Sequence, residues 1–214
     1  MVENFIMKTR NLIYGIMLFT LLSRALFIPR PTTAAEIYGI DPDHSAITFK
    51  VKHMGITFVY GRFNDLEGSY AFDDKTPENC FIEIQVKAEN IDTGNSKRDN
   101  HLRSPDFFDT EEFPYIVFKS VFVKKLQEST YEVVGYLTLH GVTQFVTVQA
   151  VKTGEIQIPG GEVRTGFETT FTVKRSDYGM KYMLGGVGDR VELTVSVEGV
   201  RNKEKDKQEP QNIE

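Results

Sequence analysis

The chain has 214 residues, a net charge of −5 at pH 7 and a single cysteine, Cys80. One cysteine excludes an internal disulfide, and an acidic chain is a poor partner for nucleic acid or for an anionic membrane surface, because both favour clustered Lys and Arg. Cys80 lies in a strand-like run, which favours a buried, inert thiol over a reactive one.

The N-terminal segment has the pattern of a secretory signal. Lys8 and Arg10 precede residues 12–22, a run without a charged residue. This is the charged and then apolar order of a signal peptide, and the run is well short of the ~20 residues that a membrane-spanning helix needs. We therefore expect a signal peptide over residues 1–35 and a periplasmic or secreted protein, with an uncleaved N-terminal anchor as the alternative.

Two small-residue cleavage sites are available, at residues 23–25 and at residues 33–35. We favour the second, because strand-like sequence begins just after Glu36. Cleavage there makes the mature chain more acidic, with a net charge of −8 in place of −5. The residues lost are four bases and one acid, Lys8, Arg10, Arg24, Arg30 and Glu3.

From Glu36 onward, apolar and polar residues alternate with a period of two, as in strands that have one apolar and one wet face. Such runs cover residues 47–51, 66–72, 82–86, 115–123, 131–139, 142–151, 163–174 and 191–197. Short turns such as His140-Gly141 separate neighbouring runs, as in antiparallel meanders. About eight strands with almost no helix predict an all-β fold, either a closed antiparallel barrel or a sandwich.

Residues 95–109 interrupt this pattern. They are polar and lack the period of two, and Asn95 is a plausible N-cap for a short helix. Ser104, followed by Pro105 and Asp106, resembles a second N-cap with proline at the first helical position. We expect a short helical excursion here, at one end of the barrel.

The last segment, residues 201–214, is rich in Lys, Glu, Gln and Asn. A segment with so few apolar residues is expected to be a disordered, charged tail. The sequence thus divides into a signal peptide over residues 1–35, one β-barrel domain over residues 36–200 and this tail.

In water the polar face of the strands must lie outside, so the interior of the barrel is apolar. The inward phase gives the candidate cavity residues Phe49, Val51, His53, Tyr70, Phe72, Ile84, Val86, Phe118, Leu139, Phe167, Phe171 and Leu193. Strand pattern does not separate a packed core from a ligand cavity. It also leaves open a small transmembrane β-barrel, whose apolar face is turned to lipid.

Residues 176–188 form a loop with several large apolar side chains beside Gly185, Gly186 and Gly188. Two interpretations stand side by side: a flexible flap over an apolar opening, or a loop packed on the barrel exterior. Candidates for a head-group or mouth contact are Arg175, Asp177, Tyr178 and His101. For Arg175, a structural salt bridge with Asp177 or another carboxylate is favoured over head-group binding.

Motifs for metal binding and catalysis are missing from the sequence. The four histidines show no HxxxH spacing and have no CxxC partner, and there is no G-x-S-x-G or Gly-rich phosphate loop. We therefore expect no metal, no catalytic residues and no enzymatic activity.

Several motifs resemble, in order, those of the YceI-like family. They lie at residues 41–45, 49–53, 59–63, 91–93, 98–102, 107–108, 118–120, 135–143, 175–180 and 188–191. Each motif alone is weak, but together they span residues 38–200 in the expected order.

This resemblance implies a lipocalin-like barrel with a long-chain isoprenoid or other amphiphilic lipid along its axis, for carriage, storage or sequestration in the cell envelope. It implies no cofactor apart from that lipid, for which a polyprenyl chain or a polyisoprenoid quinone precursor is the expectation. We expect the lipid as partner, no nucleic acid and no stable membrane insertion, and leave a homodimer open. A stress or redox protein whose lipid is incidental is the alternative.

Overall fold

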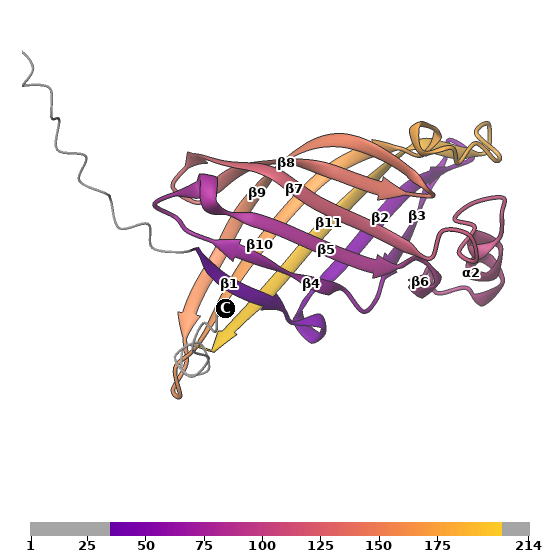
Figure 1. The fold of residues 1–214 in the computed structure, drawn as a ribbon. Helices are drawn as coiled ribbons and strands as arrows, with labels where there is room; N and C mark the ends of the chain where they lie inside the picture. Colours follow the sequence, from indigo (N-terminus) through magenta and orange to yellow (C-terminus); the bar gives the residue numbers. More distant parts are fainter. Residues whose placement is uncertain (1–34, 203–214) are drawn as a thin grey trace, which may run out of the picture. The chain divides into compact units, whose positions relative to one another are not determined.

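The computed structural model describes residues 35–202. The predicted signal peptide therefore lies outside the described residues, apart from Ala35, and so does the tail from residue 203 onward. Within this range the chain forms a β-barrel with one short α-helix (Figure 1).

Eleven strands follow one another within residues 35–202. They are β1 (Glu36–Ile40), β2 (Ala46–His53), β3 (Thr57–Phe63), β4 (Glu67–Phe72), β5 (Phe81–Lys87), β6 (Ile91–Asp92), β7 (Tyr115–Gln127), β8 (Thr130–Leu139), β9 (Val142–Gln157), β10 (Glu162–Lys174) and β11 (Val187–Asn202). The helix is α2 (Ser96–Arg103). Short 3-10 turns are η1 (Pro42–His44), η2 (Pro77–Asn79), η3 (Ala88–Asn90) and η4 (Arg175–Tyr178).

The sheet closes on itself because β11 has partners along both edges. One edge pairs with β10, and the other pairs with β2 and then with β1, where Val200 lies opposite Gly39. Every neighbouring pair is antiparallel, and β1 continues the ring through β4, β5, β7, β8, β9 and β10. The predicted all-β antiparallel barrel is confirmed.

Eleven strands make an eight-stranded barrel because three of its strands are interrupted. β1 and β2 lie end to end along β11. In the next row, β4 pairs with β1 and β3 pairs with β2. In the third row, β5 pairs with β4 and β6 pairs with β3. The first break is η1, where the Asp41 side chain accepts a hydrogen bond of 3.0 Å from the Asp43 backbone N–H and Pro42 occupies the first helical position. Proline removes a ladder donor there, so the strand stops and restarts.

The helical excursion is shorter than expected. Asn95 caps α2 as predicted, since its side chain accepts a hydrogen bond of 3.0 Å from the Arg98 backbone N–H. The second N-cap, predicted at Ser104, is wrong. Ser104 instead terminates α2, with both its N–H and its hydroxyl bonded to the carbonyl of His101, and the chain continues in turns.

Strand β11 also runs past the predicted end of the domain at Val200. Arg201 and Asn202 still pair with β10, and Arg201 is only 8% exposed. Its guanidinium lies 2.5 Å from a carboxylate oxygen of Glu36 and over the ring of Tyr38. A charged residue stays in the ladder here because an opposite charge and an aromatic face receive it.

Candidate functional site

A cavity of about 240 Å³ runs through the interior of the barrel. It is lined by residues from nearly every strand and from the segments at one end. The predicted residues among them are Phe49, Val51, Tyr70, Phe72, Ile84, Val86, Phe118, Leu139, Phe167, Phe171 and Leu193. The alternation of the strands therefore assigned the inward face correctly and left open only whether that face was fully packed.

His53 is the exception among the predicted cavity residues. It is in phase with Phe49 and Val51 but is not part of the lining. It is the last residue of β2, opposite Val187, beside an irregularity in the β2–β11 register between Val187 and Val191. Alternation gives the side of a regular sheet and not the packing at an irregular strand end, which is why this prediction was wrong.

The cavity is elongated along the strands. On β10 alone the lining runs from Phe167 through Phe171 to Arg175, at the start of η4. That distance is about 27 Å along an extended strand. A site of this length, with an apolar surface, suits a chain-like ligand better than a compact one.

One end of the cavity is closed by packed aromatic rings. Tyr38 stacks on Tyr70 at 5.2 Å, and Phe167 makes edge contacts with Tyr70, Phe72 and Tyr131. Edge-to-face pairs of this kind contribute beyond the area that they bury, about 0.5–1.5 kcal/mol each. The aromatic end is therefore a rigid floor.

Tyr70, on β4, ties this floor to β10, a strand with which β4 does not pair. Its hydroxyl donates a hydrogen bond of 3.1 Å to the Thr165 carbonyl and contacts the Thr165 side chain. Burial raises the pKa of Tyr70 to about 12, so the hydroxyl stays a donor across the physiological range. The ring fits only because residue 199 is glycine, since a Cβ there would overlap the phenol.

A second glycine makes room for Phe49. Gly61 lies directly opposite Phe49 in the β2–β3 pair, and a Cβ at Gly61 would lie 2.8 Å from Cε1 of the Phe49 ring and 2.9 Å from Cγ2 of Thr93. The Phe49 ring therefore occupies the space over residue 61 that a side chain would fill.

The other end of the cavity is built from α2, its following turns and the loop 176–188. Leu102, Phe107 and Phe108 reach the lining from the first segment, and Met180 and Val187 from the loop. Sequence reasoning named none of these as cavity residues. Phe107 and Phe108 lie outside the alternating runs, so the strand pattern could not place them in the cavity. Only their position in a family motif pointed to a role for them.

Arg175 ties this loop down. Its side chain donates hydrogen bonds to the carbonyls of Met180, Val187 and Gly188, at 2.9, 2.9 and 3.0 Å. The residue is 4% exposed, lines the cavity and lies 6.0 Å from the centre of the Phe107 ring. Burial lowers the pKa of Arg175, and the nearby Asp189 carboxylate opposes that effect.

The prediction that Arg175 forms a salt bridge with Asp177 or another carboxylate is therefore wrong, because its guanidinium has no ion pair among the described residues and bonds to three carbonyls. The Asp177 side chain lies on the exposed side of η4, and the guanidinium is held by main-chain oxygens instead. Asp189 completes the closure from the other side of the loop, accepting hydrogen bonds from the N–H and hydroxyl of Ser176 at 3.0 and 2.9 Å. These Ser176 bonds lower the pKa of Asp189.

The remaining mouth candidates lie beside the cavity and not in its lining. Tyr178, the last residue of η4, is buried, and this burial raises its pKa to about 12. His101 bonds to Asp106 at 2.8 Å, and its ring packs against Phe107 and Tyr182. His101 thus connects α2 to the loop 176–188.

Two side chains with polar atoms, Thr169 and Cys80, lie in the cavity lining. The buried hydroxyl of Thr169 has no hydrogen-bond partner among the described residues, halfway along the β10 side of the cavity. Cys80 is half-buried near the aromatic end, and burial raises the pKa of its thiol. The thiol is thus disfavoured as a nucleophile, in line with the inert role expected for it.

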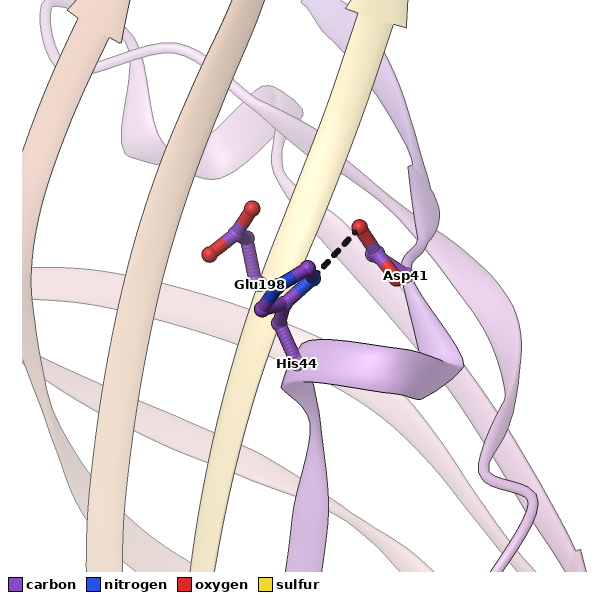
Figure 2. Close-up of side chains that lie close together, drawn as sticks. All are labelled: Asp41, His44 and Glu198. Atoms are coloured by element: carbon purple, nitrogen blue, oxygen red, sulfur yellow. Dashed lines mark hydrogen bonds and ion pairs between the residues drawn. The ribbon is translucent and has the colours of Figure 1, made fainter.

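Outside the barrel wall, Asp41, His44 and Glu198 bring three potential metal ligands together (Figure 2). Arg164 already lies between the two carboxylates, with Nη1 at 2.9 Å from Asp41 and 2.5 Å from Glu198. The hydrogen bond between the His44 ring and the Asp41 carboxylate lowers the pKa of Asp41 and raises the pKa of His44. Because a guanidinium already balances the acids, the cluster is an ion-pair network that joins η1 and its N-cap to β10 and β11.

Within residues 35–202, no helix combines the length and the apolar character needed to cross a bilayer.

Comparisons with known proteins agree with this architecture. A model of the YceI-like domain matches residues 38–199. A UPF0312 protein of Pseudomonas aeruginosa is 41% identical over 182 residues, covering 84% of this chain and 94% of the relative. The solved YceI protein of Campylobacter jejuni is 27% identical, with a TM-score of 0.64 over 71% of this chain and 90% of its own.

A solved polyisoprenoid binding domain from Saccharophagus degradans is similar in fold. It is 16% identical, with a TM-score of 0.60, and the match covers 76% of this chain and 97% of that domain.

Proposed function

Because the chain belongs to the YceI-like domain family, we propose that it binds a long-chain isoprenoid or similar amphiphilic lipid along the axis of the barrel. The observation that carries the proposal is the continuous apolar cavity between the aromatic floor and the loop 176–188. The polyisoprenoid binding domain among the similar folds supports the chemical class of the ligand.

The energetics favour a chain-like ligand held by its tail. Each methylene group removed from water contributes about 0.8 kcal/mol, so a chain that fills the cavity gains most of its affinity from the wall. Ordering the chain offsets part of that gain. Chain length should therefore decide affinity, while polar groups decide orientation.

Arg175 is the group proposed to orient the ligand. Of the cavity lining, Arg175 and Glu168 are the charged members within the described residues, and Glu168 lies on the exposed phase of β10. A guanidinium has five N–H donors, and Arg175 uses three for the loop carbonyls. A polar head group at this end would meet a cation, with its tail directed toward the floor.

The outer wall opposes the transmembrane alternative. Ion pairs join neighbouring strands on that side, among them Lys50 with Glu192 at 2.8 Å and Lys119 with Glu83 at 2.6 Å. A barrel with lipid around it has the reverse arrangement, with its apolar face outward. We propose a binding protein exported to the cell envelope, acting in lipid carriage, storage or sequestration and not in catalysis.

The test is organic extraction of the purified protein followed by mass spectrometry. A stoichiometric isoprenoid or other long-chain lipid is the expected result, and its absence from protein made in the native organism would contradict the proposal. Cys80 supplies a second measurement, because it is the only cysteine and lines the cavity. Bound lipid should slow its alkylation, and delipidation should restore the rate.

A further inference from the structure

The end of the barrel beside the loop 176–188 carries a group of exposed apolar side chains. We call it the apolar rim: Met54, Ile56, Phe58, Tyr182, Met183 and Leu184, which are 40–85% exposed. The β2–β3 hairpin and the loop are joined here, since the Met54 backbone N–H donates to the Gly186 carbonyl at 2.7 Å. In Figure 1 the hairpin and the loop lie together at one end of the barrel.

Two rim residues have a backbone that their side chains disfavour. Met54 has φ of 51° and Met183 has φ of 50°, both in the left-handed region. In the hairpin, Met54 and Gly55 both have positive φ and the Ile56 N–H bonds to the His53 carbonyl, a turn that prefers Asn or Gly. A methionine there is strained, and such strain concentrates at functional positions.

The charge of the rim differs from that of the whole protein. Residues 50–61 and 178–188 contain Lys50, Lys52 and Lys181 and no Asp or Glu, although the chain carries −5 overall. Lys50 pairs with Glu192 on the adjacent strand, which leaves Lys52 and Lys181 as the positive charges of the rim. Lys50 and Lys52 lie beside the Phe58 ring, 5.7 and 5.9 Å from its centre. Lysines next to Met, Ile, Leu and aromatic side chains are the composition that favours the surface of a lipid bilayer.

The rim is continuous with the cavity. Tyr182 packs against Phe107 at 5.3 Å, and Phe107 lines the cavity. Met180 and Val187, from the same loop as Met183, also line it. A lipid that leaves the cavity at this end would therefore emerge among rim side chains.

We infer that the apolar rim inserts into the surface of a lipid bilayer, so that the ligand passes between membrane and cavity without crossing water. The inference rests on the proposed lipid binding, because it names where that lipid is exchanged. Net negative charge opposes adsorption of the protein as a whole. It is overcome locally by Lys52 and Lys181 and by the apolar groups that leave water.

The test places a polarity-sensitive dye at the rim. Ile56→Cys in a Cys80→Ser background is labelled with nitrobenzoxadiazole and mixed with phosphatidylcholine vesicles, with and without phosphatidylglycerol. Ile156→Cys in the same background is the matched control, because Ile156 is also an exposed isoleucine and lies at the opposite end, level with Val200 on β11. Both proteins carry the same N-terminus, so only the dye position differs.

Insertion predicts a blue shift and a several-fold rise in emission at position 56, larger with phosphatidylglycerol, and none at position 156. Equal responses at the two positions, or none at position 56, would overturn the inference. A rise at position 56 with protein concentration and no vesicles would overturn it too, by assigning the rim to a second copy of the chain.

A second variant connects docking to exchange. Ile56→Ser should slow transfer of a fluorescent polyprenyl analogue from vesicles about tenfold, as expected for losing one buried aliphatic side chain, while Ile156→Ser transfers normally. Equal transfer by both would also count against docking. Lipid extraction from the same samples separates the two proposals. If lipid is bound but the dye does not respond, the proposed lipid binding stands and membrane docking fails. If the dye responds but no lipid is bound, membrane docking stands and the proposed lipid binding fails.

Discussion

The guanidinium of Arg175 donates a hydrogen bond of 2.9 Å to the main-chain carbonyl of Met180, five residues further along the same loop. With its bonds to Val187 and Gly188, this contact holds both ends of the loop from one buried side chain. The loop is thereby neither a free flap nor a segment packed on the outer wall. It is a closed cover that Arg175 holds from inside the barrel, with further bonds between Ser176 and Asp189 and between Met54 and Gly186.

Replacing Arg175 with methionine should release this cover. Three buried carbonyls would lose their donor, so we expect the free energy of unfolding to fall by about 3 kcal/mol. Hydrogen exchange should rise over residues 176–188, and lipid release should become faster. Exchange by mass spectrometry and stopped-flow lipid transfer measure the two effects. Faster exchange throughout the barrel, with the loop no different from the strands, would show a general loss of stability instead.

The inward face is tested by introducing a charge into the cavity. Phe171→Asp should abolish lipid retention and cost several kcal/mol, because a carboxylate in an apolar cavity is unpaired or must be protonated. Glu192→Ala, on the outer face of β11 and paired only with Lys50, should stay within about 0.5 kcal/mol of the parent. Urea melts and lipid extraction compare them, and similar behaviour of the two variants would refute the assignment of faces.

Glu198 would not serve as a second outer-face control. It follows the same alternation as Glu192, but its carboxylate pairs with Arg164 and its backbone N–H donates a hydrogen bond of 3.0 Å to the Ser45 hydroxyl oxygen. Periodicity gives the side of the sheet on which a residue lies and does not give its neighbours. Of these two glutamates, only Glu192 is therefore expected to tolerate replacement by alanine without a loss of stability.

The close approach of Phe49 to Gly61 predicts a specific coupling. Gly61→Ala should destabilise the barrel by about 1–3 kcal/mol, because its methyl group overlaps the Phe49 ring. Adding Phe49→Leu should recover part of the loss, which a double-mutant cycle in thermal melts would reveal. Gly185→Ala is the control, since a Cβ there meets nothing within 4 Å. Strictly additive effects would show that the ring does not limit residue 61.

The ion-pair network at η1 predicts a pH dependence. The His44 pKa is raised by Asp41, so its contribution to stability is complete below about pH 6.5 and is lost as pH rises through the folded pKa. The Asp41 pKa is lowered, so its contribution is present above about pH 3.8 and is lost as pH falls through the folded pKa. Asp41→Asn should return the His44 pKa toward 6.5.

An NMR titration of the His44 ring measures this shift, with Asp43→Asn as the neighbouring control. The control should leave the His44 titration where it is in the parent, because the His44 ring bonds to the Asp41 carboxylate. An unchanged His44 titration in Asp41→Asn would contradict the pairing.

Sequence alone predicted the barrel and most of its inner face because these depend on local alternation. Tyr70, Phe118 and Leu193 belong to regular runs, so their phase was readable without knowing any partner. The prediction for His53 was wrong because this residue ends β2 beside a register shift, where alternation no longer determines the neighbours of a side chain. Arg175 was placed near the mouth, but its carbonyl partners depend on how the loop folds back, which no spacing encodes.

The pairing of Gly39 with Val200 joins the first and last strands of the ring. Bringing together residues so far apart in sequence carries a large loop-closure entropy, and folds dominated by such contacts form slowly. Until β11 is in place, the inner faces of the earlier strands are an open apolar sheet prone to aggregation. The interval before β11 joins β1 is thus the period in which this protein most needs a chaperone, or a lipid to cover the exposed face.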